Sequence, residues 1–129
     1  MKKRLFLSCI LALALAVPAL ASQPAVPDQP LEFKGAKKTV IFNHSTHQSV
    51  ECVACHHNVD GKANYQKCAT SGCHDDLTAK KGLNSLYAVV HARSGLKYDT
   101  CLSCHLKLAA DQPDKKKELA GCSKSKCHP

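Results

Sequence analysis

The sequence predicts a small, mainly helical and irregular domain, with a few short helices and one small N-terminal β-hairpin packed around something other than its own side chains. Two observations lead to this fold class. Of the 108 residues from Ser22 to Pro129, only 19 are Leu, Ile, Val or Phe, which is below the fifth that usually separates a folding chain from a disordered one. Eight cysteines in the same segment form four pairs, each followed directly by histidine. A chain this short therefore needs further groups to complete its core.

The N-terminus has the three regions of an export signal. A basic start, KKR, precedes an apolar run at 5–17, and the small-residue pattern ALA ends at Ala21. The run is shorter than the roughly 20 apolar residues that a membrane-spanning helix needs. We therefore expect residues 1–21 to be a signal peptide cleaved near Ala21, and residues 22–129 to be one exported domain.

Cleavage would leave a basic domain, because it removes three of the 18 basic residues and none of the ten acidic ones, giving a charge of +5. Such a charge is typical of proteins that meet acidic proteins, membranes or nucleic acid, and also of a solvated surface that keeps a protein soluble. No run of stacking aromatics is interleaved with the lysines, and an exported protein lies apart from nucleic acid. We expect no nucleic-acid partner.

The four cysteine pairs share one ending, since Cys and His are adjacent each time. The motifs are CVACH at 52–56, CATSGCH at 68–74, CLSCH at 101–105 and CSKSKCH at 122–128. Two thiols add across the two vinyl groups of one porphyrin, and the next histidine is then held over the iron. A gap of four residues makes a wider loop than a gap of two. The motifs predict four covalently attached haem c groups, bound by Cys52, Cys55, Cys68, Cys73, Cys101, Cys104, Cys122 and Cys127.

The histidine count matches the eight axial positions of four irons. The proximal ligands are expected to be His56, His74, His105 and His128, and the remaining four histidines are His44, His47, His57 and His91. Adjacent residues cannot both face one iron, so His57 should reach a different haem from His56. The only methionine is Met1, which excludes the Met–His ligation that raises the potential of many c-type cytochromes. Four bis-histidine haems of low potential are therefore expected.

Three other classes of protein use the same residue types. Zinc fingers separate the cysteine pair from its histidines by about a dozen residues, whereas here Cys and His touch. A disulfide scaffold fits export and an even cysteine count, yet it gives no reason for the histidines. A haem enzyme needs an iron with an open position, and the ligand count leaves none. We therefore expect no enzyme and keep a zinc-stabilised binding module as an alternative.

Regular structure should be sparse and short. Residues 22–30 contain three prolines and should be an extended leader. The segments 31–33 and 39–42 flank a turn with Gly35, which predicts a small hairpin. Asn43 is then expected to cap a helical turn that carries His44 and His47 on one face.

Two helices are expected further along the chain. Apolar residues recur at helical spacing from about Ser85 to Arg93, with His91 on the apolar face and Gly95 as a stop. A second helix should open at Asp111 and Pro113 and end at Gly121. The attachment motifs have no fixed period, so one compact domain wrapped around four haems is expected rather than a repeat array.

These features resemble one known family. The string FNHSTH at 42–47, the doubled histidine, the mixture of two-residue and four-residue gaps and the ending KSKCH are similar to the tetrahaem cytochrome c3 family, the class III c-type cytochromes of sulfate-reducing bacteria. The resemblance covers essentially all of residues 22–129. It implies four ligand sets: Cys52, Cys55, His56 and His44; Cys68, Cys73, His74 and His57; Cys101, Cys104, His105 and His47; and Cys122, Cys127, His128 and His91.

The resemblance also implies a function in sulfate respiration. Members are monomeric periplasmic electron carriers that take electrons from hydrogenase and pass them to membrane-associated multihaem redox proteins, without inserting into the membrane. Phe42 would match a ring packed among the haems. Lysines near the fourth haem would match the docking surface, namely Lys115, Lys116, Lys117, Lys124 and Lys126. Ser123 departs from the family, where lysine is common, and this slightly weakens the docking surface. The lengths between His74, His91 and Cys101 also vary in the family, which leaves partner preference open.

Two further expectations remain from the sequence. Electron uptake should be coupled to proton uptake. Four haems in so small a domain are close neighbours, and each added electron cancels a positive charge at an iron, which raises the proton affinity of nearby haem propionates. A role as terminal reductase or electron store acting on soluble metal ions is an alternative that the sequence does not distinguish from the role of an electron carrier.

Overall fold

The computed structural model describes residues 24–123 and 125–128, so the predicted signal peptide and Lys124 lie outside the described residues. The elements are few and short, as the sequence predicts. They are β1 (Leu31–Lys34), β2 (Thr39–Phe42), the 3₁₀ helix η1 (His44–His47), α1 (Cys52–Cys55), β3 (Asn58–Val59), β4 (Lys62–Ala63), α2 (Leu86–His91), α3 (Cys101–Asp111), the 3₁₀ helix η2 (Pro113–Lys115) and α4 (Lys116–Ala120).

Strands β1 and β2 form the predicted hairpin. They pair antiparallel, with Leu31 opposite Phe42 and Lys34 opposite Thr39. Leu31 and Phe33 are partly buried while Glu32 and Lys34 are exposed, because alternate side chains of a strand point to opposite faces. Gly35 closes the turn by donating its N–H to the carbonyl of Lys38 at 3.2 Å. A Cβ at this glycine would lie 2.9 Å from that carbonyl oxygen.

The predicted helix over 85–93 is confirmed in a shorter form as α2. Ser85 precedes it, and its hydroxyl accepts a hydrogen bond from the N–H of Ala88. The helix stops at His91, and the carbonyl of Ala92 accepts a hydrogen bond of 2.5 Å from the Thr100 hydroxyl. Thr100 is also the N-cap of α3, in a capping box with Ser103. One threonine therefore fixes the start of α3 against the end of α2.

Two predicted details are wrong. The helix expected from Asp111 to Gly121 is split, because Asp111 ends α3 and the chain restarts with η2 and α4. Proline disfavours a helical conformation in the residue before it, and Gln112 has φ −133° and ψ 71°. The Asn43 side chain makes no capping hydrogen bond. Its backbone carbonyl instead accepts hydrogen bonds from Thr46 and His47, each at 2.9 Å.

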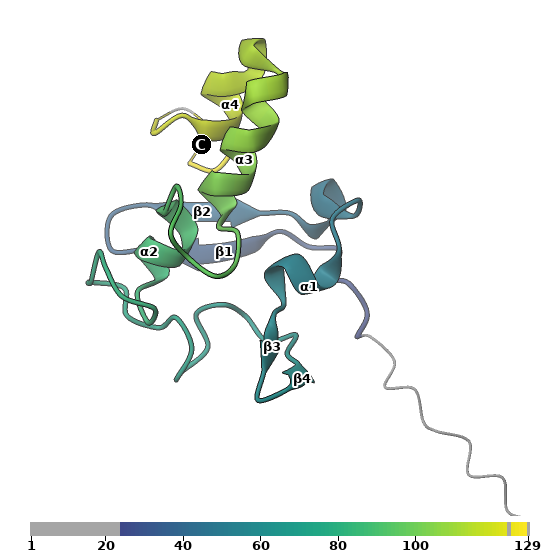
Figure 1. Cartoon of the computed structure of the whole chain (residues 1–129), viewed down its shortest axis with the longest axis vertical. Helices are drawn as coiled ribbons and strands as arrows, with labels where there is room; N and C mark the ends of the chain where they lie inside the picture. Colours follow the sequence, from purple (N-terminus) through teal and green to yellow (C-terminus); the bar gives the residue numbers. More distant parts are fainter. Residues whose placement is uncertain (1–23, 124, 129) are drawn as a thin grey trace, which may run out of the picture.

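The hairpin lies across the middle of the molecule, with α3 and α4 at one end and α1, β3 and β4 towards the other (Figure 1). Among the described residues, the only buried apolar side chains are Leu86 and Ala109. Several large apolar side chains are exposed, including Leu83 at 67% and Val53 at 53%. The elements therefore do not enclose a core of their own side chains. No helix in the described ranges is long and apolar enough to cross a membrane.

Candidate haem-binding site

The attachment motif CLSCH lies on the first turns of α3. Cys101 and Cys104 are three residues apart and His105 is four residues from Cys101, so all three side chains lie on one helix face. The motif CVACH has the same form in miniature, with α1 spanning its two cysteines and His56 at the C-cap. A helical turn therefore presents two thiols and one imidazole in the same direction.

The motif CATSGCH, with a gap of four, closes in the same way as the motif CVACH, with a gap of two. The N–H of His56 donates to the carbonyl of Cys52 at 2.7 Å, and the N–H of His74 donates to the carbonyl of Cys68 at 3.0 Å. The two extra residues are taken up in a turn, where the N–H of Cys73 donates to Thr70. The wider gap therefore keeps the relation between the first cysteine and the histidine.

Cysteines of different motifs lie near one another. The pKa of the Cys101 thiol is raised to about 12, first by burial of the thiol and then by the charges of Cys68, Cys55 and Cys127. Although the residue is exposed overall, protein atoms around the sulfur oppose its ionisation. Burial also raises the pKa of Cys55, together with the charges of Cys68 and Cys104. A thiol from each of the other three motifs therefore lies within electrostatic range of Cys101.

Each histidine has one other histidine beside it. Ring centroids are 6.3 Å apart for His44 and His56 and 6.0 Å for His47 and His105. They are 6.0 Å apart for the pair His57 and His74 and 6.1 Å for the pair His91 and His128.

These separations suit a shared metal ion. An imidazole nitrogen lies about 1 Å from its ring centroid and binds a transition metal at about 2 Å, so rings on opposite sides of one ion have centroids about 6 Å apart. These ring neighbours coincide with the ligand pairs that the family resemblance implies, and His56 and His57 lie beside different partners.

The hydrogen bonds of the imidazoles leave one nitrogen of most rings available. A carbonyl can only accept, so an Nδ1 atom that contacts one must carry the proton, and Nε2 then keeps its lone pair. Six of the eight histidines have this contact. In each case an imidazole Nδ1 donates to a backbone carbonyl: His47 to Asn43, His57 to Asn58, His74 to Leu83, His91 to Tyr87, His105 to Leu119 and His128 to Thr39.

His44 differs from these six. Its Nδ1 is buried and has no hydrogen-bond partner among the described residues. The pKa of His44 is lowered, first by burial and then by the neighbouring His56 and His47. A neutral ring, as a metal ligand must be, is therefore favoured here.

The donor set fits haem better than zinc. Structural zinc needs four converging protein ligands, and among the described residues no three His, Cys, Asp or Glu side chains converge as they would around a metal ion. Pairs of histidines instead fit an iron whose other four ligands come from a porphyrin. Within the described residues, seven cysteines are free of disulfides, namely Cys55, Cys68, Cys73, Cys101, Cys104, Cys122 and Cys127. The exposed apolar side chains also fit apolar cofactors as packing partners.

Aromatic rings pack against several of the histidines. Phe42 lies between two of them, with centroids 4.9 Å from His44 and 4.6 Å from His47. Tyr65 lies 5.5 Å from His56, Tyr87 lies 4.3 Å from His91 and Tyr98 lies 4.6 Å from His57. The position of Phe42 agrees with the family resemblance. The tyrosine contacts were not predicted from the sequence, although Tyr87 and His91 are four residues apart on one helix.

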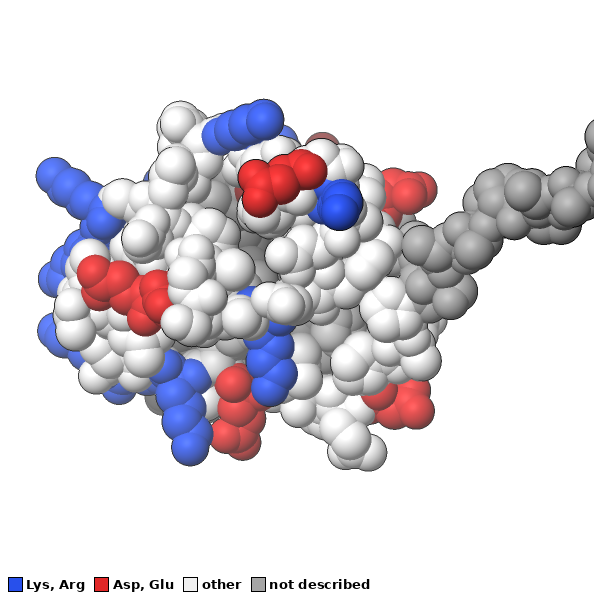
Figure 2. Space-filling view, turned by 90° about the horizontal axis from the view of Figure 1, so that it is seen from below, with Lys and Arg blue, Asp and Glu red and all other residues white. Residues whose placement is uncertain are grey.

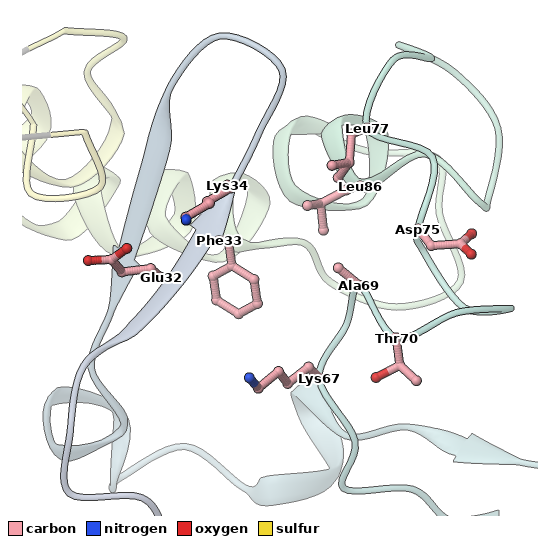
Figure 3. Close-up of a pocket in the computed structure, with 9 residues that line it drawn as sticks. All are labelled: Glu32, Phe33, Lys34, Lys67, Ala69, Thr70, Asp75, Leu77 and Leu86. Carbon is pink, nitrogen blue, oxygen red and sulfur yellow. The ribbon is translucent and has the colours of Figure 1, made fainter.

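A cleft of about 220 Å³ lies between β1 and the loop that carries Cys68 and Cys73. Phe33 points into it from β1, and Leu77 and Leu86 line its far wall (Figure 3). The carboxylate of Asp75 points away (Figure 3). The part lined by Phe33, Leu77 and Leu86 fits the edge of an apolar group beside the second attachment motif, and the rest of the lining is mostly polar or charged.

Comparison with known proteins decides the family. The model of the class III cytochrome c family matches residues 20–128. The chain belongs to this family. It is 45% identical to a cytochrome c3 of Nitratidesulfovibrio vulgaris Hildenborough over 98% of both chains, and 37% identical to a cytochrome c3 of Desulfovibrio desulfuricans over 78% of this chain and 87% of that one.

Solved structures agree with this assignment. The oxidised cytochrome c3 of Desulfovibrio desulfuricans is 64% identical, with a TM-score of 0.80 over 83% of this chain and 100% of that chain. The di-tetrahaem cytochrome c3 of Desulfovibrio gigas is 28% identical, with a TM-score of 0.59 over 81% of this chain and 97% of that one. The cofactors are therefore four covalently attached haem c groups, and the protein is an electron carrier.

Proposed function

We propose that the protein is a periplasmic, low-potential electron carrier whose four haems are each held by two histidines. The observation that carries this proposal is the set of four histidine pairs with centroids 6.0 to 6.3 Å apart. When bound, each haem iron takes up and releases one electron. The protein's own residues attach the group, fill both axial positions and so leave no position open for a substrate.

The ligand sets proposed here combine the motifs with the ring pairs. The first haem takes His56 and His44, and the second takes His74 and His57. The third takes His105 and His47, and the fourth takes His128 and His91. Each is attached through the two cysteines of the motif that contains the first histidine of its pair. Two imidazoles per iron and the absence of a methionine after Met1 favour low potentials.

Docking is proposed at the lysines of η2 and α4, beside the fourth motif. Lys115, Lys116 and Lys117 are exposed there. Lys126 is also exposed, but its ammonium pairs with Glu118 at 2.5 Å, which reduces its contribution to a positive surface. Lys124 lies outside the described residues. Away from α3 and α4, the face seen in Figure 2 carries basic side chains with acidic ones among them, so neither sign covers it continuously.

The partner with the best support is hydrogenase, which the family resemblance implies and which would donate electrons and protons together. The test is reduction of the purified holoprotein under hydrogen with catalytic amounts of a periplasmic hydrogenase, followed by the ferrous haem absorption band. Rapid reduction of all four haems at a rate set by the hydrogenase concentration supports the proposal. Reduction no faster than that of a small redox dye by the same enzyme would contradict a dedicated carrier.

A further inference from the structure

One histidine pair has a different ring orientation from the other three. The planes of His57 and His74 are twisted by 59°. The other pairs are nearly parallel, with interplanar angles of 4°, 13° and 10°. All four have nearly equal centroid separations, so the difference lies in rotation of a ring and not in its distance from the shared position.

The two rings of the twisted pair are fixed in different ways. His74 donates from Nδ1 to the carbonyl of Leu83 at 2.5 Å, a short contact that determines its plane. The corresponding contact of His57, to Asn58, is 3.4 Å long and is the longest of the six. Hydrogen bonds weaken steeply at such lengths. The backbone therefore constrains the plane of His57 less than it constrains any of the other five.

The stronger constraint on His57 is an aromatic ring. Tyr98 stacks on it with a centroid distance of 4.6 Å and an interplanar angle of 12°. Stacked aromatic pairs contribute beyond their buried area, so the ring of His57 follows the plane of Tyr98. The twist relative to His74 is the consequence.

Tyr98 is itself held in place. The ammonium of Lys97 lies 5.1 Å from the Tyr98 ring centroid, within the range of a cation–π interaction. The next residue, Asp99, accepts hydrogen bonds from Ser103 at 3.1 Å and Lys107 at 2.8 Å, both on α3. The segment that carries Tyr98 is therefore tied to the helix that bears the third attachment motif.

Tyr87 offers a matched comparison within the same chain. It stacks on His91 with a centroid distance of 4.3 Å and an angle of 20°, yet the pair His91 and His128 is nearly parallel. His91 also donates from Nδ1 to the Tyr87 carbonyl at 3.0 Å. That carbonyl remains whatever side chain follows it. Removing the Tyr87 ring should therefore leave the plane of His91 fixed.

We propose that Tyr98 is a positioning residue that sets the plane of His57 and so gives the second haem electronic properties unlike those of the other three. The inference rests on the ligation assigned under the proposed function. Each axial imidazole donates π density to the iron d orbital perpendicular to its own plane. The iron has two d orbitals that can interact with the imidazoles in this way. Parallel rings act on the same one and separate the two in energy, whereas twisted rings act on both and leave them close in energy. Ring orientation set by neighbouring residues thereby tunes the metal.

The experiment is electron paramagnetic resonance of the fully oxidised holoprotein and its variants. The ferric wild type should give four low-spin haems, of which one has a larger maximum g value than the rest. Tyr98→Leu should lose this large-g signal, and the second haem should then give a signal like those of the other three haems. Tyr98→Phe keeps the stacked ring and should retain the signal. Tyr87→Leu should retain it as well.

Several results would overturn the inference. Four low-spin haems with similar g values in the wild type would contradict an effect of the twist on the second haem. A large-g signal that persists in Tyr98→Leu would contradict the role of Tyr98. A high-spin haem in the wild type would instead contradict the bis-histidine ligation, and the two failures are thus distinguishable. Haem content per chain is measured for each variant. If Tyr98→Leu binds fewer than four haems, Tyr98→Met is compared instead.

Discussion

His128 and Thr39 are joined by a hydrogen bond, from Nδ1 of the imidazole to the backbone carbonyl at 3.2 Å, although 89 residues separate them in the sequence. This contact places the last attachment motif against β2. The partner ring of His128 is His91 at the end of α2, at a centroid distance of 6.1 Å. The ring pair proposed as ligands of the fourth haem therefore lies where the hairpin, α2 and the C-terminal segment meet.

Replacing His91 by methionine should change one potential and leave attachment intact. Attachment uses the cysteines, so His91→Met is expected to carry four haems. A thioether ligand stabilises the ferrous state relative to imidazole, and one potential should rise by on the order of 0.1 V. A spectroscopic redox titration of the variant measures this change.

The control is Val90→Met, which adds a methionine beside His91 without removing an imidazole. Its titration curve should match that of the wild type. A His91→Met curve that also matches the wild type would remove His91 from the ligand set.

Charge reversal at Lys116 and Lys117 should slow electron uptake from hydrogenase. Opposite charges speed encounter, and salt screens them within about 10 Å at 0.1 M. Lys116→Glu with Lys117→Glu should reduce the second-order rate roughly tenfold at low salt. Raising the salt concentration should slow the wild type towards the variant.

Lys80→Glu with Lys81→Glu is the matched control, because these lysines are also adjacent and exposed and the change in net charge is the same. They lie in the loop after the second motif, away from α4. Equal slowing by both double variants would mean that net charge, rather than the α4 lysines, governs the rate.

Gly121 should resist substitution because of a close backbone approach. A Cβ at this position would clash with the carbonyl oxygen of Lys117, which accepts the N–H of Gly121 at 3.0 Å. Gly121→Ala should therefore lower the free energy of unfolding by about 1–3 kcal/mol, the usual cost of overpacking. Thermal unfolding of the holoprotein tests this, with the exposed neighbour Ser123→Ala expected to be neutral.

Haem potentials should fall as pH rises. Reduction cancels one positive charge at an iron, so nearby haem propionates are less stabilised as anions and their pKa rises. By reciprocity a bound proton makes the next electron easier to add, which means higher potentials at lower pH. Redox titrations at about pH 6 and about pH 8 bracket the range in which a raised propionate pKa would act. Superimposable curves would sink the coupling and leave the carrier role intact.

The chemistry of the site was predictable because covalent attachment fixes residue types and their spacing. The Cys-His endings and the count of eight histidines required no knowledge of the fold. The ring pairing came from the family resemblance, since nothing in the spacing of His47 and His105 states that they lie 6.0 Å apart. The contacts to backbone carbonyls, such as that of His105 with Leu119, depend on tertiary structure and leave no mark in the sequence.

Two elements, the β3–β4 hairpin and helix α3, were not predicted although the sequence carries a local signal for each. The hairpin β3–β4 turns at Asp60 and Gly61, which both have positive φ, and an Asp-Gly pair is the sequence typical of such a turn. That signal was present and overlooked. Helix α3 was missed because its first residues were interpreted only as an attachment motif, although Thr100 could have indicated an N-cap.

The most direct test of the central claim is addition of carbon monoxide to the fully reduced holoprotein at neutral pH, followed by absorption spectroscopy. If two histidines fill both axial positions of every iron, none is open to this ligand. The account predicts that the spectrum of all four haems stays unchanged. A shift of the Soret band equivalent to one haem or more would show an open iron and contradict the proposed ligation.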